Sequence, residues 1–136
     1  DTGIEVLDSQ YANWNRDDGF TVMQDFLSRF PKIDAVWAQD DDIAIGVIQA
    51  IRQARRQDEM FVVGGGGMKD IIQRVKRGDK LTPVDVLYPP GMISTAMELT
   101  TIKLLADAPI EGEYILSSPL ITEQNADDYY FPDSPF

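Results

Sequence analysis

Three consecutive aspartates, Asp40–Asp42, follow the apolar run Ala35–Ala38 and are the first candidates for chemistry in this sequence. Carboxylates at the end of a strand can cap the next helix, hold a metal ion, accept a phosphoryl group or accept hydrogen bonds from a ligand. A calcium loop is excluded because Ile51 occupies the position where a carboxylate would close the site. We expect one of the aspartates to cap the following helix and Asp40 to contact a ligand.

A Mg²⁺-dependent phosphoacceptor site is the enzymatic alternative for these aspartates. Such a site also needs acidic residues at a second strand end and a lysine late in the sheet. The last clear strand of the sequence, Val84–Tyr88, offers Val86 and Leu87 instead. We therefore expect no catalytic residue, although a carboxylate-based enzyme or a phosphoacceptor domain stays open as an alternative.

The run Gly64–Gly67 follows an apolar strand and precedes a helical segment, which is where phosphate-binding loops occur. No Gly-Lys-Ser or Gly-Lys-Thr follows it, and Lys69 and Asp70 stand where a G-x-G-x-x-G motif would need glycine. We interpret the run as a tight turn whose backbone can come close to a ligand.

Two tryptophans could offer an aromatic surface to a ligand. Trp14 lies in the polar stretch Asn13–Arg16, whereas Trp37 lies in the middle of an apolar run and is assigned to packing. An indole face can cover the C–H face of a sugar ring, and a carboxylate can accept hydrogen bonds from two adjacent hydroxyls. Trp14 and Asp40 therefore predict a site for a sugar or another polyol, although Trp14 could instead pack at the start of the following helix.

Composition excludes several further classes. The chain has no histidine and no cysteine, which excludes Ser-His and Cys-His nucleophiles, histidine and thiolate metal sites, and disulfides. We expect no cofactor and no metal. The net charge is −11, and because binding to phosphate backbones depends on clustered Lys and Arg, nucleic acid is not expected as a partner.

Short apolar runs alternate with segments of helical periodicity, which predicts an α/β fold with three layers and a parallel sheet in the middle. The predicted strands are Ile4–Asp8, Ala35–Ala38, Met60–Gly64, Val84–Tyr88 and, late in the chain, Tyr114–Leu116. The predicted helices are Arg16–Arg29, a helix with Ala44, Val47, Ile48 and Ile51 on one face, a shorter helix ending at Arg77, and Ile93–Ala106. The first four strands are expected to lie parallel in one sheet, buried on both faces.

Ligands of an open parallel sheet bind beyond the carboxyl ends of its strands. Four segments that are distant in the sequence would meet at that edge: Ser9–Asn15, Gln39–Asp42, Gly65–Gly67 and Leu87–Pro89. We therefore place the polyol site there.

The sequence around these positions resembles the ribose-binding-protein-like family of periplasmic sugar-binding proteins, which serve ABC importers. The resemblance rests on the stretch Ala35–Gly46 (AVWAQDDDIAIG), on Val62–Gly64 (VVG) and on Gly78–Leu81 (GDKL) before the last major strand. It covers nearly the whole chain, but only the second half of a family member. It implies an incomplete periplasmic binding protein type I lobe, a periplasmic location, and a membrane permease as a partner.

Carried over position by position, the resemblance assigns Trp14 to stacking on the sugar and Asp40 to hydrogen bonding with its hydroxyls. Gly66 stands where the ribose pattern has an aspartate, and Leu87 stands where it has a glutamine. We therefore expect ligand contacts at four positions, Trp14, Asp40, Gly66 and Leu87. The loss of two polar groups argues against ribose bound in the same pose.

The resemblance also implies a domain organisation. Residues 1–88 would form the C-terminal lobe, residues 89–112 a segment of the other lobe, and residues 113–136 a return strand and tail. The helix Ile93–Ala106 would then lack its packing partner, so we expect it to repack on its own sheet or to pair with a second copy of the chain. The main hypothesis is the substrate-binding component of a sugar or polyol importer. The effector domain of a LacI-type transcription regulator, which shares the fold, is the alternative.

Overall fold

The computed structural model describes residues 3–88 and 91–135. Its sheet has four strands in the order β1-β2-β3-β4, formed by Ala35–Trp37, Phe61–Val63, Val84–Val86 and Leu120–Thr122. The first three strands are parallel, and β4 pairs antiparallel with β3. Three of the four strands expected in the parallel sheet are therefore confirmed, each somewhat shorter than predicted.

The predicted strand Ile4–Asp8 is wrong, because this segment is irregular and pairs with no strand. Its apolar side chains lie in solvent, with Ile4 78% exposed, and Asp8 is tied to helix α1 (Arg16–Arg29) through an ion pair with Arg29. An alternating pattern becomes a strand only where a neighbouring strand supplies hydrogen-bond partners. Within the described residues this segment has no such neighbour.

The predicted strand Tyr114–Leu116 is also wrong. The chain there is irregular and exposed, and the returning strand forms six residues later as β4. Ile121 in the middle of β4 is fully buried against helix α3 (Lys69–Lys76) and pairs with Asp85 of β3. Burial of this one side chain explains why the pairing occurs at β4 and not earlier.

Local signals account for the helices. Asn15 caps α1 by accepting hydrogen bonds from the backbone of Asp17 and Asp18. Helix α2 (Asp41–Gln53) buries the predicted apolar face. Gly46 lets α2 approach α1 closely, because a Cβ at this position would overlap the carbonyl oxygen of Arg16. Helix α3 is followed by Gly78 in the left-handed region (φ +68°).

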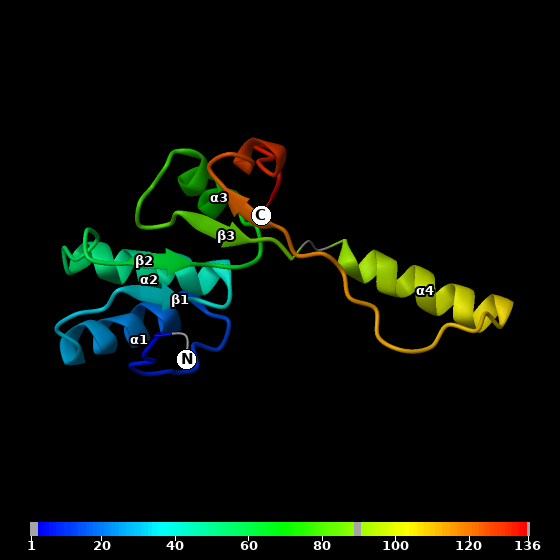
Figure 1. The fold of residues 1–136 in the computed structure, drawn as a ribbon, viewed down its shortest axis with the longest axis horizontal. Coiled ribbons are helices and arrows are strands. Elements are labelled where there is room, and N and C mark those ends of the chain that lie inside the picture. The colour runs from blue at the N-terminus through cyan, green and yellow to red at the C-terminus, as the bar shows by residue number, and fades with distance from the viewer. Residues whose placement is uncertain (1–2, 89–90, 136) are drawn as a thin grey trace.

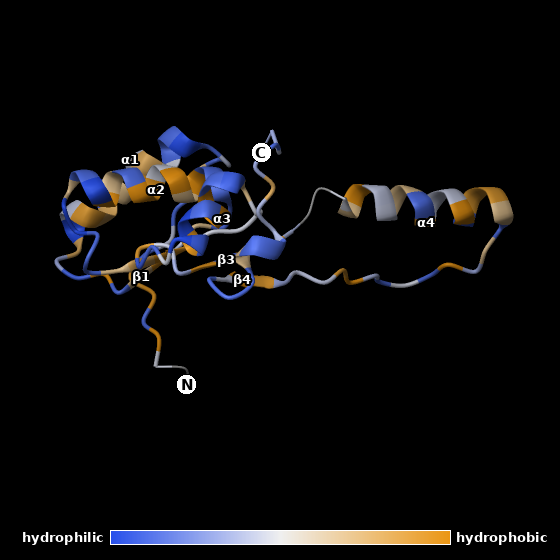
Figure 2. Cartoon of the chain, turned by 90° about the horizontal axis from the view of Figure 1, so that it is seen from above, coloured by the Kyte–Doolittle hydropathy of each residue, from blue (hydrophilic) through white to orange (hydrophobic). Residues whose placement is uncertain are grey.

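Helices α1, α2 and α3 lie on the same side of the sheet (Figure 2). The main core forms where α1 packs on α2 and α2 packs on β1 and β2. The other face of the sheet is open within the described residues, and Trp37 is 74% exposed on it. The α/β class and the incomplete lobe are confirmed. The assignment of Trp37 to packing is wrong, because no element among the described residues covers that face.

A second, smaller cluster joins α3 to the end of the chain. Its buried members are Ile72, Val75, Ile121 and Ala126. The short 3-10 helix Ala126–Asp128 and the following residues pack on α3, where the Gln73 side-chain amide donates a hydrogen bond to the Tyr130 hydroxyl (3.0 Å). The tail is therefore an ordered part of the fold.

Helix α4 (Met92–Ala106) projects away from the sheet (Figure 1). None of its residues is buried, and it exposes a series of large apolar side chains: Met92, Ile93, Met97, Ile102, Leu104 and Leu105. The expectation that this helix repacks on its own sheet is therefore wrong. No helix within residues 3–88 and 91–135 is long and apolar enough to cross a membrane.

Candidate functional site

The carboxyl ends of β1, β2 and β3 meet at one edge of the sheet. Backbone hydrogen bonds extend the pairing beyond the strands, from the amide of Ala38 to the carbonyl of Val63 (2.9 Å) and from the amide of Gly66 to the carbonyl of Val86 (2.9 Å). Gly66 and Leu87 form an isolated parallel bridge. The segments that follow the three strands are thus held side by side.

Asp40 lies at this edge as the N-cap of α2. Its Oδ1 accepts a hydrogen bond from the backbone amide of Ile43 (3.0 Å), and the side chain is half-buried. The expectation that one of the three aspartates caps this helix is confirmed, and the cap is Asp40. A carboxylate has a second oxygen with its own lone pairs, so capping leaves Asp40 able to accept a hydrogen bond from a ligand hydroxyl.

Asp41 is buried and holds the glycine run in place. Its Oδ2 accepts hydrogen bonds from the backbone amides of Gly67 (2.9 Å) and Met68 (2.7 Å). Hydrogen bonds to an ionised carboxylate are about twice as strong as neutral ones. Asp41 therefore fixes the conformation of the glycine run Gly64–Gly67, which lies at the strand-end edge.

Asp85 of β3 is fully buried next to Asp41. A Cβ at Gly64 would overlap Asp41 Oδ1 and lie 3.2 Å from Asp85 Oδ1. Both carboxyl groups therefore lie against the Cα of Gly64. Burial, the charge of Asp41 and the hydrogen bond to it raise the pKa of Asp85 to about 8. Burial also raises the pKa of Asp41.

One proton allows Asp41 and Asp85 to form a hydrogen bond with each other. As two carboxylates, Asp41 Oδ1 and both oxygens of Asp85 would have no donor. With a proton on Asp85, its hydroxyl can donate to Asp41, which already accepts two backbone amide bonds and so favours the ionised form. The sequence did contain a signal for this pair, since Asp85 is a single charge inside an apolar strand.

Tyr88 also lies at the edge and was not among the predicted site residues. It is half-buried, and its ring carbon Cε1 lies 3.2 Å from the position that a Cβ of Gly65 would occupy. Its hydroxyl lies 3.5 Å from the corresponding position at Gly66. Burial raises the pKa of the Tyr88 phenol, and the negative charges of Asp40, Asp41 and Asp85 and a hydrogen bond to Asp40 raise it further.

Trp14 precedes α1 in a turn and is 70% exposed, with a positive φ of 54°. Two residues later, the Arg16 guanidinium forms an ion pair with Asp42 at the start of α2 (2.6 Å). This contact holds the beginnings of α1 and α2 together, so Trp14 and Asp40 flank the same ion pair. That Trp14 contacts a ligand stays a prediction.

Gly66 and Leu87 take different places at this edge. Gly66 has a positive φ of 139°, a conformation that favours glycine. The Leu87 side chain lies against Gly67 and packs on the cluster that contains Ile72. The backbone of Leu87 is therefore at the edge, while its side chain contributes to packing beside α3.

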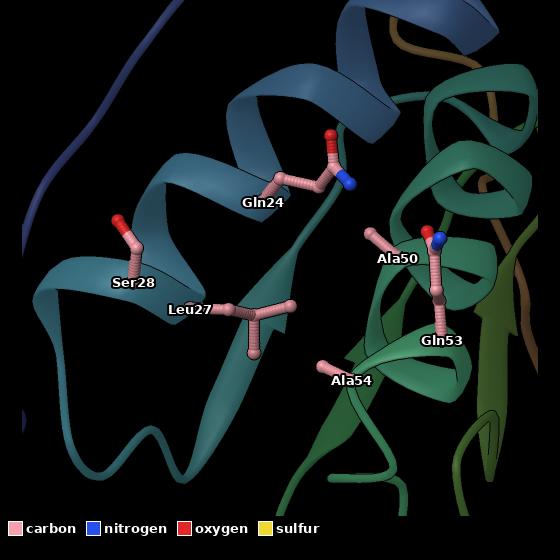
Figure 3. Close-up of a pocket in the computed structure, with 6 residues that line it drawn as sticks. All are labelled: Gln24, Leu27, Ser28, Ala50, Gln53 and Ala54. Atoms are coloured by element: carbon pink, nitrogen blue, oxygen red, sulfur yellow. The ribbon is translucent and has the colours of Figure 1, made fainter.

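A shallow pocket of about 300 Å³ lies elsewhere, between the later turns of α1 and α2 (Figure 3). Its lining residues are Gln24, Leu27, Ser28, Ala50, Gln53 and Ala54. Both helices begin at the strand-end edge, so this pocket is near their opposite ends and contains none of the predicted site residues. We base the site on the strand ends because the pocket offers no charged group. Within the described ranges, no group of three or more acidic residues is arranged to hold a metal ion.

The fold is that of an incomplete lobe of a type I periplasmic binding protein. Residues 1–104 match the family described as "Periplasmic binding protein domain", and the chain belongs to this family. Family members are binding proteins.

Two curated relatives illustrate the similarity. The putative rhizopine-binding protein of Rhizobium meliloti is 44% identical over 131 residues, which cover 93% of this chain and 41% of the relative. The Ribose import binding protein RbsB of Salmonella typhimurium is 34% identical over 121 residues, covering 89% of this chain and 40% of the relative. The chain thus spans about two fifths of the length of these relatives.

Among solved structures, the Caulobacter myo-inositol binding protein with bound myo-inositol is 27% identical and superposes with a TM-score of 0.81. The match covers 93% of this chain and 43% of that structure. The region that superposes is therefore less than half of the myo-inositol binding protein.

Proposed function

We propose that this chain is part of a receptor that binds a sugar or polyol and delivers it to the membrane permease of an ABC importer in the periplasm. The observation that carries the proposal is the half-buried carboxylate of Asp40, held at the strand-end edge by its own capping bond. The names of the relatives, which include ribose import and the binding of myo-inositol, support the transport role. They favour it over a role as the effector domain of a transcription regulator.

The chemistry of the edge suits a polyol. Asp40 offers a carboxylate oxygen to a hydroxyl, and the exposed indole of Trp14 offers an apolar face to the C–H groups of the same ligand. The backbone of Gly66 lies at the same edge, bridged to Leu87. Members of the family are binding proteins, so we infer a binding protein and not an enzyme.

We further propose the domain organisation that the family implies. Residues 1–88 form one lobe, residues 89–112 belong to the second lobe, and residues 113–136 return to the first. Two features support this division. Helix α4 has no packing partner within the described residues, and β4 brings the chain back to β3. The ligand would then lie between the lobes, with Trp14, Asp40, Gly66 and Leu87 on one side.

Calorimetric titration of the full-length protein with ribose, xylitol, D-allose and myo-inositol tests this proposal. We expect saturable binding of at least one of these, and a loss of about thirtyfold in affinity for Asp40→Ala, which corresponds to about 2 kcal/mol for hydrogen bonds to a charged group. The variant also loses a helix cap worth about 1 kcal/mol, so its thermal unfolding is measured alongside.

Asp58→Ala is the matched control, because Asp58 is exposed and lies beyond the other end of α2. It should bind as the unmodified protein does. Binding that survives Asp40→Ala unchanged would move the site away from the start of α2.

A further inference from the structure

Two of the four expected contact positions offer no polar side chain to a ligand. Gly66 has no side chain, and Leu87 directs its side chain to the α3 cluster. A polyol has a hydroxyl on nearly every carbon, and each buried hydroxyl needs a hydrogen-bond partner. A further polar side chain at this edge, beside Asp40, would supply such a partner.

Tyr88 occupies the space that the glycines leave free. A side chain at Gly65 would come within 3.2 Å of the Tyr88 ring, and one at Gly66 would come within 3.5 Å of its hydroxyl. Contacts of 3.2 Å are tighter than ordinary van der Waals packing, so the ring position depends on glycine at Gly65. The glycine run and the tyrosine are complementary in shape.

The Tyr88 hydroxyl is also close to the predicted polar contact. The charge of Asp40 is one of those that raise the pKa of the phenol, and Asp40 uses Oδ1 for the amide of Ile43, so its other oxygen is available. Burial raises the pKa of the Tyr88 phenol above its ordinary value, and the charges of Asp40, Asp41 and Asp85 raise it further. The hydroxyl therefore keeps its proton and can both donate and accept a hydrogen bond.

We propose that the Tyr88 hydroxyl contacts the ligand directly and, with the Asp40 carboxylate, forms a clamp for two adjacent hydroxyls of a polyol. This inference rests on the proposed function. A carboxylate accepts hydrogen bonds only, whereas a phenol donates and accepts, so the pair can serve one hydroxyl as acceptor and its neighbour as donor. Tyr88 thereby sets which arrangement of hydroxyls the site selects.

The test compares Tyr88→Phe with the unmodified full-length protein, using calorimetry with ribose, xylitol, D-allose and myo-inositol. The variant keeps the ring over the glycine run and removes only the hydroxyl. We expect about a five- to tenfold loss of affinity for whichever probe the unmodified protein binds, with thermal unfolding unchanged. Tyr130→Phe is the control, because it removes a hydrogen-bonded hydroxyl in the α3 cluster and should leave affinity unchanged.

A double-mutant cycle with Asp40→Asn is measured both on affinity and on the thermal unfolding of the ligand-free protein, because a purely structural coupling would appear in both. If both groups contact the same pair of hydroxyls, the effects of Tyr88→Phe and Asp40→Asn are non-additive on affinity and additive on unfolding. Gly66→Ala is a second, independent variant, since its methyl group would lie beside the hydroxyl and in a strained conformation. It should also weaken binding.

The outcomes separate the two proposals. If the unmodified protein binds a probe and Tyr88→Phe binds it equally well, the role of Tyr88 is refuted and the proposed function stands. If the unmodified protein binds none of the four probes, the proposed function fails and the role of Tyr88 fails with it. If Tyr88→Phe does not fold, Gly66→Ala decides: undiminished affinity in that variant contradicts the clamp.

Discussion

Asp41 of α2 and Asp85 of β3 lie side by side in the interior, both against the backbone of Gly64, and neither has a cation as partner in the described structure. Two buried carboxylates at this separation cannot both be ionised without a large electrostatic cost. The fold therefore contains a carboxyl group, that of Asp85, which keeps its proton near neutral pH. Its partner holds the glycine run beneath the proposed site.

The first prediction concerns pH. The pKa of Asp85 is raised from 3.8 to about 8 in the folded chain, so between these values the folded state binds more protons than the unfolded state. The free energy of unfolding should therefore fall as the pH rises from 4 to 8, by at most about 1.4 kcal/mol per pH unit for one proton. Urea denaturation of the chain at pH 5 and pH 8 measures this difference.

Asp85→Asn should flatten that dependence, because the amide carries no charge and can still donate a hydrogen bond to Asp41. At pH 8 the variant should be more stable than the unmodified chain by on the order of 1–3 kcal/mol. Asp58→Asn, at an exposed position, should keep the original slope. An identical slope in Asp85→Asn would show that the proton resides elsewhere.

The second prediction concerns Gly64. Gly64→Ala places a methyl group on Asp41 Oδ1 and against Asp85, two buried side chains that would have to shift. We expect the free energy of unfolding to fall by about 1–3 kcal/mol, the usual cost of overpacking a core. Gly91→Ala is the control, because nothing lies within 4 Å of its Cβ position. Equal stability of the two variants in urea denaturation would contradict this arrangement.

The third prediction uses the two tryptophans, which are exposed to a similar extent. Only Trp14 lies at the strand-end edge, so Trp14→Ala should weaken polyol binding by the full-length protein about tenfold, the value of one aromatic contact. Trp37→Ala should leave it unchanged. Calorimetric titration of the two full-length variants measures the difference, and equal affinities would remove Trp14 from the site.

The fourth prediction concerns α4. Its exposed apolar side chains are expected to find a partner when residues 1–136 are produced alone, and a second copy of the chain is available at high concentration. Sedimentation velocity should show association that increases with concentration. Leu105→Lys, at the most exposed apolar position of α4, should reduce it, whereas Lys103→Leu should increase it. A chain that stays monomeric throughout would refute this expectation.

Much of the fold could be read from local sequence. Asn15 is a strong helix cap, the apolar spacing in α2 has the helical period, and the parallel arrangement of β1, β2 and β3 follows from the helices between them. Since parallel strands end at the same edge of a sheet, the sequence alone also predicted that Asp40 and Gly66 lie at one edge. These features depend on contacts between residues that are close in the chain or on general rules of topology.

Only the tertiary structure decided the remaining features, because each of them depends on which elements lie next to a segment or side chain. Ile4–Asp8 has the pattern of a strand and Trp37 that of a core residue, but within residues 3–88 and 91–135 no strand lies beside the first and no element covers the second. Asp85 is a single charge in an apolar strand, and only its proximity to Asp41 explains how it is tolerated. Likewise, Tyr88 became a candidate for binding only when its ring was seen to fill the space above two glycines, since a sequence does not state which side chains share a space.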